Sequence, residues 1–319
     1  MKYLIVFIAL FLLELIYFKI ADYFNIIDKP NDRSSHTSIT LRGGGVIFYF
    51  GALLFFFLSD FQYPWFFIGL TLMSSVSFMD DIFSLPNKIR LLVHFISVLL
   101  MAYELDIFSF PWYYLVISFV VIVGVINAYN FMDGINGMTS CYSLVISGLL
   151  LIVNDNLGFI NQDLLIFSSL GVLVFAFFNF RTRAKSFAGD VGSVSIAFIL
   201  LYCLGSLIIK TGNFIYILFL AIYGIDTVWT IIRRLSLREN IFEAHRTHLY
   251  QFLGNEAKIN KLYISSIYGT LQLLVGLMTI YFSKMDYTYQ IGFSISIICI
   301  GSLVYLLIKN HVIKNYVNI

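Results

Sequence analysis

The chain has 319 residues, of which 60% are apolar and only 12% are charged, and its formal net charge at pH 7 is +2. Soluble globular domains carry about 25% charged residues. The low charge content and the mean hydropathy of +0.88 together exclude that class. The composition therefore indicates a polytopic membrane protein, and we expect no nucleic-acid partner.

Eleven apolar stretches approach the length of about 20 residues that a helix needs to cross a bilayer. We expect all of them to be helices, because a bilayer offers backbone N–H and C=O groups no partner outside the segment itself. The predicted fold is thus all-α, with about 11 transmembrane helices in one domain over residues 1–319, or 10 if one helix merges or is lost. The predicted spans are residues 2–20, 44–60, 63–79, 91–107, 110–127, 138–154, 162–180, 191–209, 213–232, 262–282 and 288–308.

The lysines and arginines orient these spans, because they are biased toward cytoplasmic loops. With the N-terminus outside, seventeen of the twenty basic residues fall in inner loops, and only Lys2, Lys210 and Lys284 fall outside. The reverse orientation inverts that ratio, so we predict an N-terminus outside. The inner loops that then face the cytoplasm lie near residues 21–43, 80–90, 127–137, 181–190 and 233–261.

The first inner loop is polar and ends in Arg42 followed by three glycines, Gly43 to Gly45. Successive glycines let a backbone approach a ligand or another helix closely. A functional segment and a simple turn into the second span are both open here.

The second inner loop begins with two adjacent carboxylates, Asp80 and Asp81, and Lys88 and Arg90 follow within ten residues. Adjacent like charges disfavour each other's ionisation unless a cation or a proton intervenes. We therefore expect a divalent metal here, or a carboxylate that acts as a base. A solvated loop at a helix end is the alternative.

Polar residues recur every three positions in the third inner loop, at Asn127, Asn130, Asp133 and Asn136. On a helix this spacing stacks the side chains along one face. Their oxygens could coordinate a hard cation, and their amides could bond a base or a sugar. The alternative is that they join transmembrane helices to one another.

The last two inner loops carry an acid and a pair of histidines. Asp190 stands between glycines at the start of the eighth span, where a helix N-terminus attracts phosphate and the acid could hold the accompanying metal; a plain helix cap is the alternative. His245, Arg246 and His248 could bind phosphate or serve in acid–base chemistry. No cysteine or third histidine is near enough to complete a zinc set, so we favour phosphate contact.

Taken together, these motifs resemble those of glycosyltransferase family 4, the polyprenyl-phosphate N-acetylhexosamine-1-phosphate transferases. The likeness runs from Asp28 to about Gln251, and the four motifs occur in the family's order. The segments 30–36, 42–45 and 245–251 are most similar to the branch that initiates O-antigen.

The resemblance implies a reaction at the cytoplasmic face of a bacterial inner membrane. N-acetylhexosamine 1-phosphate passes from a UDP-sugar, UDP-GlcNAc or a related UDP-HexNAc, to undecaprenyl phosphate, which releases UMP and starts a cell-surface polysaccharide. The implied cofactor is Mg²⁺, with Mn²⁺ as a substitute, and the oligomeric state stays open. A transporter or flippase for a phosphorylated lipid or sugar is the alternative, although such proteins place polar groups near the middle of the bilayer.

The resemblance also implies roles for individual residues. The implied catalytic residues are Asp80, Asp81 and Asp133, the implied metal ligands are Asp190 and Asn130, and the implied nucleotide-sugar contacts are Asn127, Asn136, Lys88, Arg90, His245, Arg246 and His248. Asn136 replaces an acid that the family often has, so we expect it to bond the uracil or the ribose. Asp226, inside the ninth span, is a further candidate, since an acid within the membrane is costly, and pairing with a neighbouring helix is its alternative role.

Overall fold

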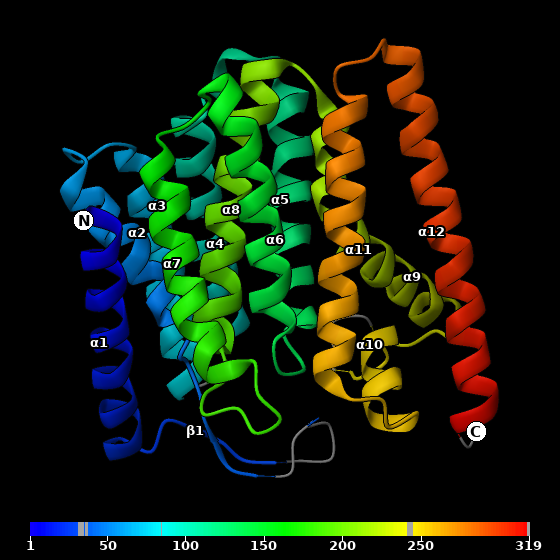
Figure 1. Ribbon diagram of the computed structural model, residues 1–319, viewed down its shortest axis with the longest axis horizontal. Coiled ribbons are helices and arrows are strands. Elements are labelled where there is room, and N and C mark those ends of the chain that lie inside the picture. Colours follow the sequence, from blue (N-terminus) through cyan, green and yellow to red (C-terminus); the bar gives the residue numbers. More distant parts are fainter. Residues whose placement is uncertain (31–34, 36–37, 84, 241–244, 318–319) are drawn as a thin grey trace.

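The protein is a bundle of helices packed roughly side by side, as the computed structural model shows (Figure 1). The structure describes residues 1–30, 35, 38–83, 85–240 and 245–317. The long helices are α1 (Lys2–Tyr23), α2 (Val46–Leu58), α3 (Pro64–Phe83), α4 (Asn87–Glu104), α5 (Trp112–Met132), α6 (Met138–Leu157), α7 (Gln162–Asn179), α8 (Gly189–Thr211), α9 (Ala221–Ser236), α11 (Lys261–Phe282) and α12 (Tyr287–Tyr316). The short elements are β1 (Ile27–Asp28), β2 (Thr40–Leu41), α10 (Leu249–Gln251) and the helical turns Ile107–Ser109, Phe214–Leu220 and Phe252–Glu256.

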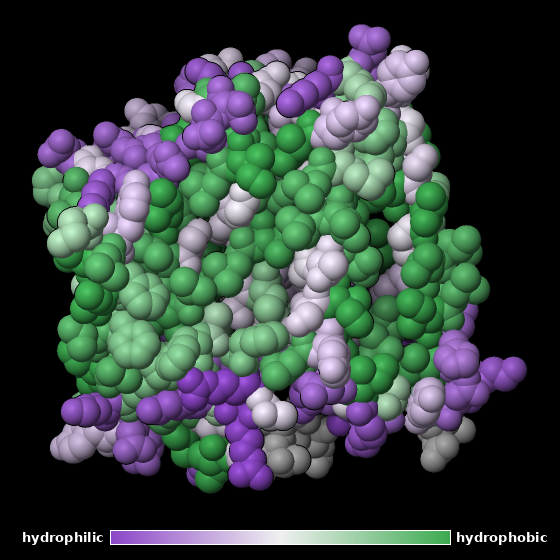
Figure 2. Space-filling model, viewed as in Figure 1, coloured by the Kyte–Doolittle hydropathy of each residue, from purple (hydrophilic) through white to green (hydrophobic). Residues whose placement is uncertain are grey.

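The all-α membrane fold is confirmed, and each predicted span contains a helix. Within the described ranges, nine helical segments are long and apolar enough to cross a membrane. The two others are α2, which has only 13 residues, and α4, whose 18 residues include the charged Lys88, Arg90 and Glu104. The number of spans and their orientation therefore stay predictions. Figure 2 shows a broad apolar belt between two polar rims, as expected of a chain that lies across a bilayer.

Two of the predicted inner loops are shorter than expected. Asp80 and Asp81 lie inside α3, which ends at Phe83, and α4 begins as early as Asn87. Likewise, Asn127 and Asn130 lie inside α5. In α3 the two acids find arginine and backbone partners, described below, so they need no loop to reach water.

Glycines allow α2 and α7 to pack closely. A methyl group on Gly51 would lie 2.7 Å from the carbonyl oxygen of Phe167, and one on Gly171 would lie 2.9 Å from that of Ile47. Small residues at such crossings are the usual means of close packing between helices in a membrane, where lipid supplies no hydrophobic drive.

We expect Gly51→Ala to lower the stability of the detergent-solubilised protein by about 1–3 kcal/mol, because the added methyl overpacks this crossing. A melting curve followed by circular dichroism measures the change. Gly148→Ala in α6 is the matched control, since its methyl would meet nothing within 4 Å. Equal melting temperatures for the two variants would contradict the packing argument.

Helix α8 is the axis of the bundle. It is the most buried of the candidate spans in the described part of the chain, since 78% of its most apolar stretch is buried. It packs against α2, α3 and α5. Its N-terminus, at Gly189 and Asp190, therefore lies where the ends of several helices meet.

A small antiparallel ribbon covers this end of the bundle. Strand β1 pairs with β2 in the register Ile27 to Leu41 and Asp28 to Thr40. The chain then runs along the segment before α8, where the Gly44 N–H donates to Phe187 O at 2.9 Å and the Gly45 N–H donates to Ala188 O at 3.1 Å. The ribbon thus places Arg42 beside the N-terminus of α8. Figure 1 shows β1 and α10 at this same end.

Candidate active site

Asp81 joins α3 to the N-terminus of α8. One carboxylate oxygen accepts the Asp190 N–H at 2.9 Å, and the other accepts the Val191 N–H at 3.0 Å. The first N–H groups of a helix have no partner within it, so a buried carboxylate is a strong cap for them. The side chain of Asp81 is 0% exposed, so its position is fixed by these bonds.

Gly189 makes this close approach possible. Its φ is +72°, and a methyl group there would lie 2.5 Å from the Oδ2 atom of Asp81 and 3.0 Å from the Cα atom of Gly43. A residue with a side chain would be strained in this backbone conformation and would also collide with the cap.

Two arginines bridge the carboxylates of the three acids. Arg42 Nε lies 2.7 Å from Asp81 Oδ1, and its Nη2 lies 3.3 Å from Asp190 Oδ1. Arg90 Nη1 lies 2.8 Å from Asp80 Oδ2, and its Nη2 lies 3.5 Å from Asp190 Oδ2. Asp190 therefore lies between the two guanidinium groups. Burial lowers the pKa of Arg42, but the charges of Asp81 and Asp190 outweigh it and raise that pKa above the ordinary value.

The end of α5 adds two more oxygen-bearing side chains to this set. The Asn130 side chain hydrogen-bonds to Asp190. Asp133 accepts the Thr139 hydroxyl at 2.5 Å, and burial, reinforced by the charges of Asp190 and Asp81, raises its pKa to about 7. We name Asp80, Asp81, Asn130, Asp133 and Asp190, together with Arg42 and Arg90, the acid cluster.

The donor set of the acid cluster fits a hard divalent cation. It holds four carboxylates against two guanidinium groups, and its neutral member, Asn130, offers an amide oxygen. Carboxylate and amide oxygens are the ligands that Mg²⁺ takes from proteins, and a cation would relieve the repulsion among the acids. In the described ranges, no three histidine, cysteine or acidic side chains are arranged as a ready-made metal site, so the fit rests on the chemistry of the donors.

The histidine loop is held by a buried acid in α9. Asp226 is 1% exposed; its Oδ1 atom accepts the Leu249 N–H at 3.1 Å and lies 3.1 Å from Nδ1 of His248, while its Oδ2 accepts the Tyr268 hydroxyl at 2.7 Å. A carboxylate beside Nδ1 fixes the tautomer and the orientation of an imidazole. Asp226 is therefore a positioning residue for this loop, and its bond to Tyr268 also pairs α9 with the neighbouring helix α11.

We expect Asp226→Ala to destabilise the protein by about 3–5 kcal/mol, because truncating a buried charged group leaves its partners unpaired. Faster amide hydrogen exchange at residues 245–251 should accompany the lower melting temperature. Thr227→Val, at the next position in α9, is the control. The Thr227 hydroxyl is buried and has no hydrogen-bond partner in the described part of the chain. An Asp226→Ala variant as stable as the control would remove the positioning role.

The histidine loop also touches the end of α5. The Tyr250 hydroxyl donates to Phe131 O at 2.7 Å, and the ring of His245 lies 5.8 Å from that of Phe131 and 5.1 Å from that of His248. Burial, together with the nearby His248, lowers the pKa of His245 to about 4. His245 is therefore neutral at physiological pH and is suited to a polar contact rather than to ion pairing.

The structure places the other predicted substrate contacts outside the acid cluster. Lys88 is exposed, and the Asn127 amide bonds to Val123 O of its own helix at 2.9 Å. Nη2 of Arg246 lies 3.8 Å from Oε1 of Glu256.

Asn136 and His248 are engaged within the protein. The Asn136 amide donates to Arg181 O at 2.7 Å, and the Ser265 hydroxyl donates to Asn136 O at 2.8 Å. Asn136 therefore holds the α7–α8 loop against the start of α11. His248 is 1% exposed. A side chain this buried is better placed to support the loop than to contact a substrate.

Two residues that the structure brings into the site had only a weak signal in the sequence. Arg42 was visible only through the glycines that follow it, and Asp226 only as an acid within an apolar stretch. Neither signal names a partner, since Arg42 and Asp190 are 148 residues apart.

Comparison with known proteins adds an independent finding. Residues 63–211 match the family model described as Glycosyl transferase family 4. The chain is 30% identical over 239 residues to the undecaprenyl-phosphate alpha-N-acetylglucosaminyl 1-phosphate transferase of Thermotoga maritima. The matched region covers 70% of this chain and 72% of that protein.

Two further relatives have similar coverage. A probable undecaprenyl-phosphate N-acetylglucosaminyl 1-phosphate transferase of Bacillus subtilis is 25% identical over 258 residues, with 74% of this chain and 71% of that protein covered. The phospho-N-acetylmuramoyl-pentapeptide-transferase of Thermotoga maritima is 28% identical over 262 residues, with 73% and 82% covered.

Proposed function

The chain belongs to glycosyltransferase family 4, and we propose that it transfers N-acetylhexosamine 1-phosphate from a UDP-sugar to undecaprenyl phosphate. The acid cluster carries this proposal, because it gathers oxygen ligands and two arginines at one end of a membrane bundle. Two of these relatives are named as undecaprenyl-phosphate transferases, which supports the lipid acceptor, and none is named as a transporter. N-acetylglucosamine is the sugar we propose first, since the Bacillus subtilis and Thermotoga maritima undecaprenyl-phosphate transferases are named for it.

In the proposed reaction, a phosphate oxygen of undecaprenyl phosphate attacks the β-phosphorus of the UDP-sugar. The new P–O bond forms as the bond from the β-phosphorus to the α–β bridging oxygen breaks, and UMP leaves with that electron pair. Such transfers depend on positioning and on charge neutralisation rather than on covalent help from the protein. Mg²⁺ held by Asp190 and Asn130 would supply part of that neutralisation.

The contacts divide the work among the acids. Both oxygens of Asp81 are occupied by Arg42 and by the first N–H groups of α8, so we assign Asp81 to holding the site's shape. Asp80 and Asp133 are the candidates for orienting or deprotonating the lipid phosphate. The pKa of Asp133, raised to about 7, suits a group that exchanges a proton near neutral pH.

For the nucleotide sugar we propose Arg90, His245 and Arg246 as contacts of the diphosphate or the sugar, with Lys88 and Asn127 at the edge. Asn136 and His248, which the sequence predicted as nucleotide-sugar contacts, we now propose as supports of this region, because their side chains are engaged within the protein. The positive-inside bias of the basic residues supports an active site on the cytoplasmic face of a bacterial inner membrane.

The test is UMP release by the purified protein in detergent with UDP-GlcNAc, undecaprenyl phosphate and Mg²⁺. We expect one lipid diphosphate sugar, identified by mass spectrometry, for each UMP. UMP release that does not require the lipid would contradict the proposal. A panel of UDP-N-acetylhexosamines in the same assay identifies the preferred sugar and tests the O-antigen branch.

Removal of divalent metal should abolish the activity. The proposed ligands are oxygens, so Mg²⁺ or Mn²⁺ should restore turnover after EDTA treatment, whereas Zn²⁺ should restore little. The assay is again UMP release. Full turnover in EDTA would take metal out of the mechanism.

A further inference from the structure

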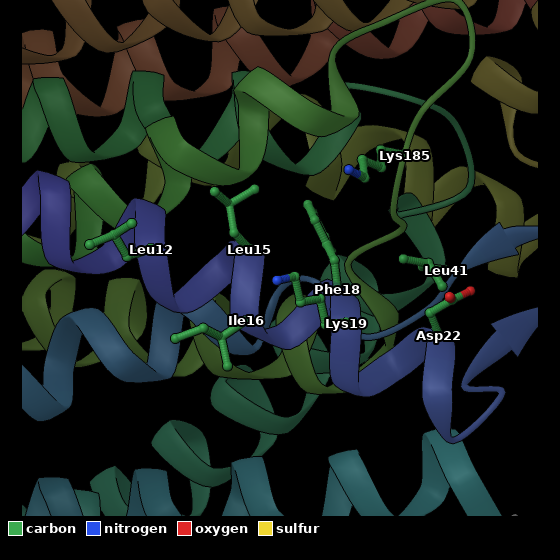
Figure 3. Close-up of a pocket in the computed structure, with 8 residues that line it drawn as sticks. All are labelled: Leu12, Leu15, Ile16, Phe18, Lys19, Asp22, Leu41 and Lys185. Carbon is green, nitrogen blue, oxygen red and sulfur yellow. The ribbon is translucent and has the colours of Figure 1, made fainter.

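A groove runs along the outer side of α1 at the end of the bundle that holds the acid cluster. Its volume is about 660 Å³. The close-up in Figure 3 shows side chains of α1 on one side and Lys185, from the loop before α8, across from them. The groove is thus formed where α1 meets the α7–α8 loop, apart from the acid cluster.

The part of the groove formed by the middle of α1 is apolar and continues the exposed face of that helix. Leu12 and Ile16, one helical turn apart, are 54% and 52% exposed and line the groove with Leu15 and Phe18. Leu4, Ile5 and Ile8 extend the same exposed apolar face along the helix. In a membrane protein this face contacts hydrocarbon, so an acyl chain could lie along it without exposing polar groups.

The end of the groove is positively charged. Lys19 and Lys185 line it with a single acid, Asp22. The Lys185 ammonium lies 5.0 Å from the ring centre of Phe18, and the ring face attracts a cation at this distance. Arg181 and Arg183 are exposed on the same loop, so the region around the groove carries a surplus of cations.

We propose that this groove binds an anionic phospholipid, with its phosphate between Lys19 and Lys185 and one acyl chain along Leu12 and Ile16. Basic pockets between helices near the membrane boundary favour lipids of this charge. A zwitterionic lipid has the same chains but presents no net charge to the two ammonium groups.

The groove is joined to the acid cluster through the backbone. Leu41 lines the groove and directly precedes Arg42, which pairs with Asp81 and Asp190. In the segment before α8, the Phe187 N–H donates to Leu41 O at 2.8 Å. The bound lipid would therefore pack against the same two segments that position Arg42.

The experiment is native mass spectrometry of the full-length protein titrated with phosphatidylglycerol and with phosphatidylcholine of matched chains. We expect a preference of roughly tenfold or more for phosphatidylglycerol, because each lysine at a membrane surface contributes about 1 kcal/mol toward an anionic lipid. The double variant Lys19→Gln/Lys185→Gln should lose that preference. Ile16→Trp, which fills the apolar part, should lower the occupancy of both lipids.

Lys210→Gln is the matched control, since Lys210 is an exposed lysine in the last turn of α8, at the other end of that helix. It should keep the full preference. The proposal fails if the double variant retains the preference or if undecaprenyl phosphate displaces phosphatidylglycerol one for one, which would make the groove an acceptor site. Because lipid binding is measured without turnover, its failure leaves the proposed transferase reaction untouched.

Discussion

Asp190→Asn is expected to lower UMP release by roughly 10³-fold while the protein stays folded. Asp190 is the acid that both arginines and Asn130 approach, and we assign it to Mg²⁺. Losing its charge removes a metal ligand, and stabilisation of this kind is worth several kcal/mol of the barrier. Initial rates across a range of Mg²⁺ concentrations measure the effect.

The control for this variant is Asp155→Asn. Asp155 is an exposed acid near the C-terminal end of α6, whereas the acid cluster lies near that helix's N-terminal end. It should retain full turnover. A metal role predicts in addition that residual Asp190→Asn activity needs more Mg²⁺ for half-saturation, which a purely structural loss would not require. Wild-type rates in Asp190→Asn would refute the assignment.

Gly189→Ala is expected to cost at least about 10²-fold in turnover without touching any proposed metal ligand. Its methyl would lie 2.5 Å from Asp81 Oδ2 in a backbone with φ at +72°. Asp81 must then leave the N–H groups of α8, and Arg42 moves with it. Misplacement of reactive groups by about 1 Å is enough for a loss of this size.

Gly212→Ala separates the collision from the backbone strain. Gly212 follows α8 with φ at +64°, yet a methyl group there meets nothing within 4 Å. Both variants carry the strain of a left-handed alanine, but only Gly189→Ala collides with the acid cluster. Comparable turnover of the two variants would show that the Asp81 cap is not needed.

Much of the fold could be predicted because the decisive property is local. Whether a stretch such as 191–209 crosses a membrane depends on the transfer of its own residues into lipid, which its composition determines. The exceptions follow the same physics. Helix α4 begins at Asn87, whereas its span was predicted from residue 91. Hydropathy missed this first turn because Lys88 and Arg90 are charged.

Six members of the acid cluster were proposed as site residues from the sequence, Arg42 was left open as functional or as part of a simple turn, and none of their direct contacts was predicted. Asp80, Asp190 and Asn130 could be proposed from their residue types and from the placement of their segments on one face of the membrane. The sequence did not indicate that Asp81 would cap α8, because a cap depends on where α3 crosses another helix. Nor did it indicate that His248 would be buried against Asp226, since two residues in different segments meet only after packing.

The sequence by itself determined that this is a polytopic membrane protein of glycosyltransferase family 4, with its acids, amides and histidines in particular segments. Hydropathy and motif order are properties of the linear chain, so they survive without coordinates. Only the tertiary structure decided which of those side chains meet. The bare backbone of Gly189 lets Asp81 reach the N-terminus of α8, and ion pairs and caps form only where packing brings donor and acceptor within about 3 Å.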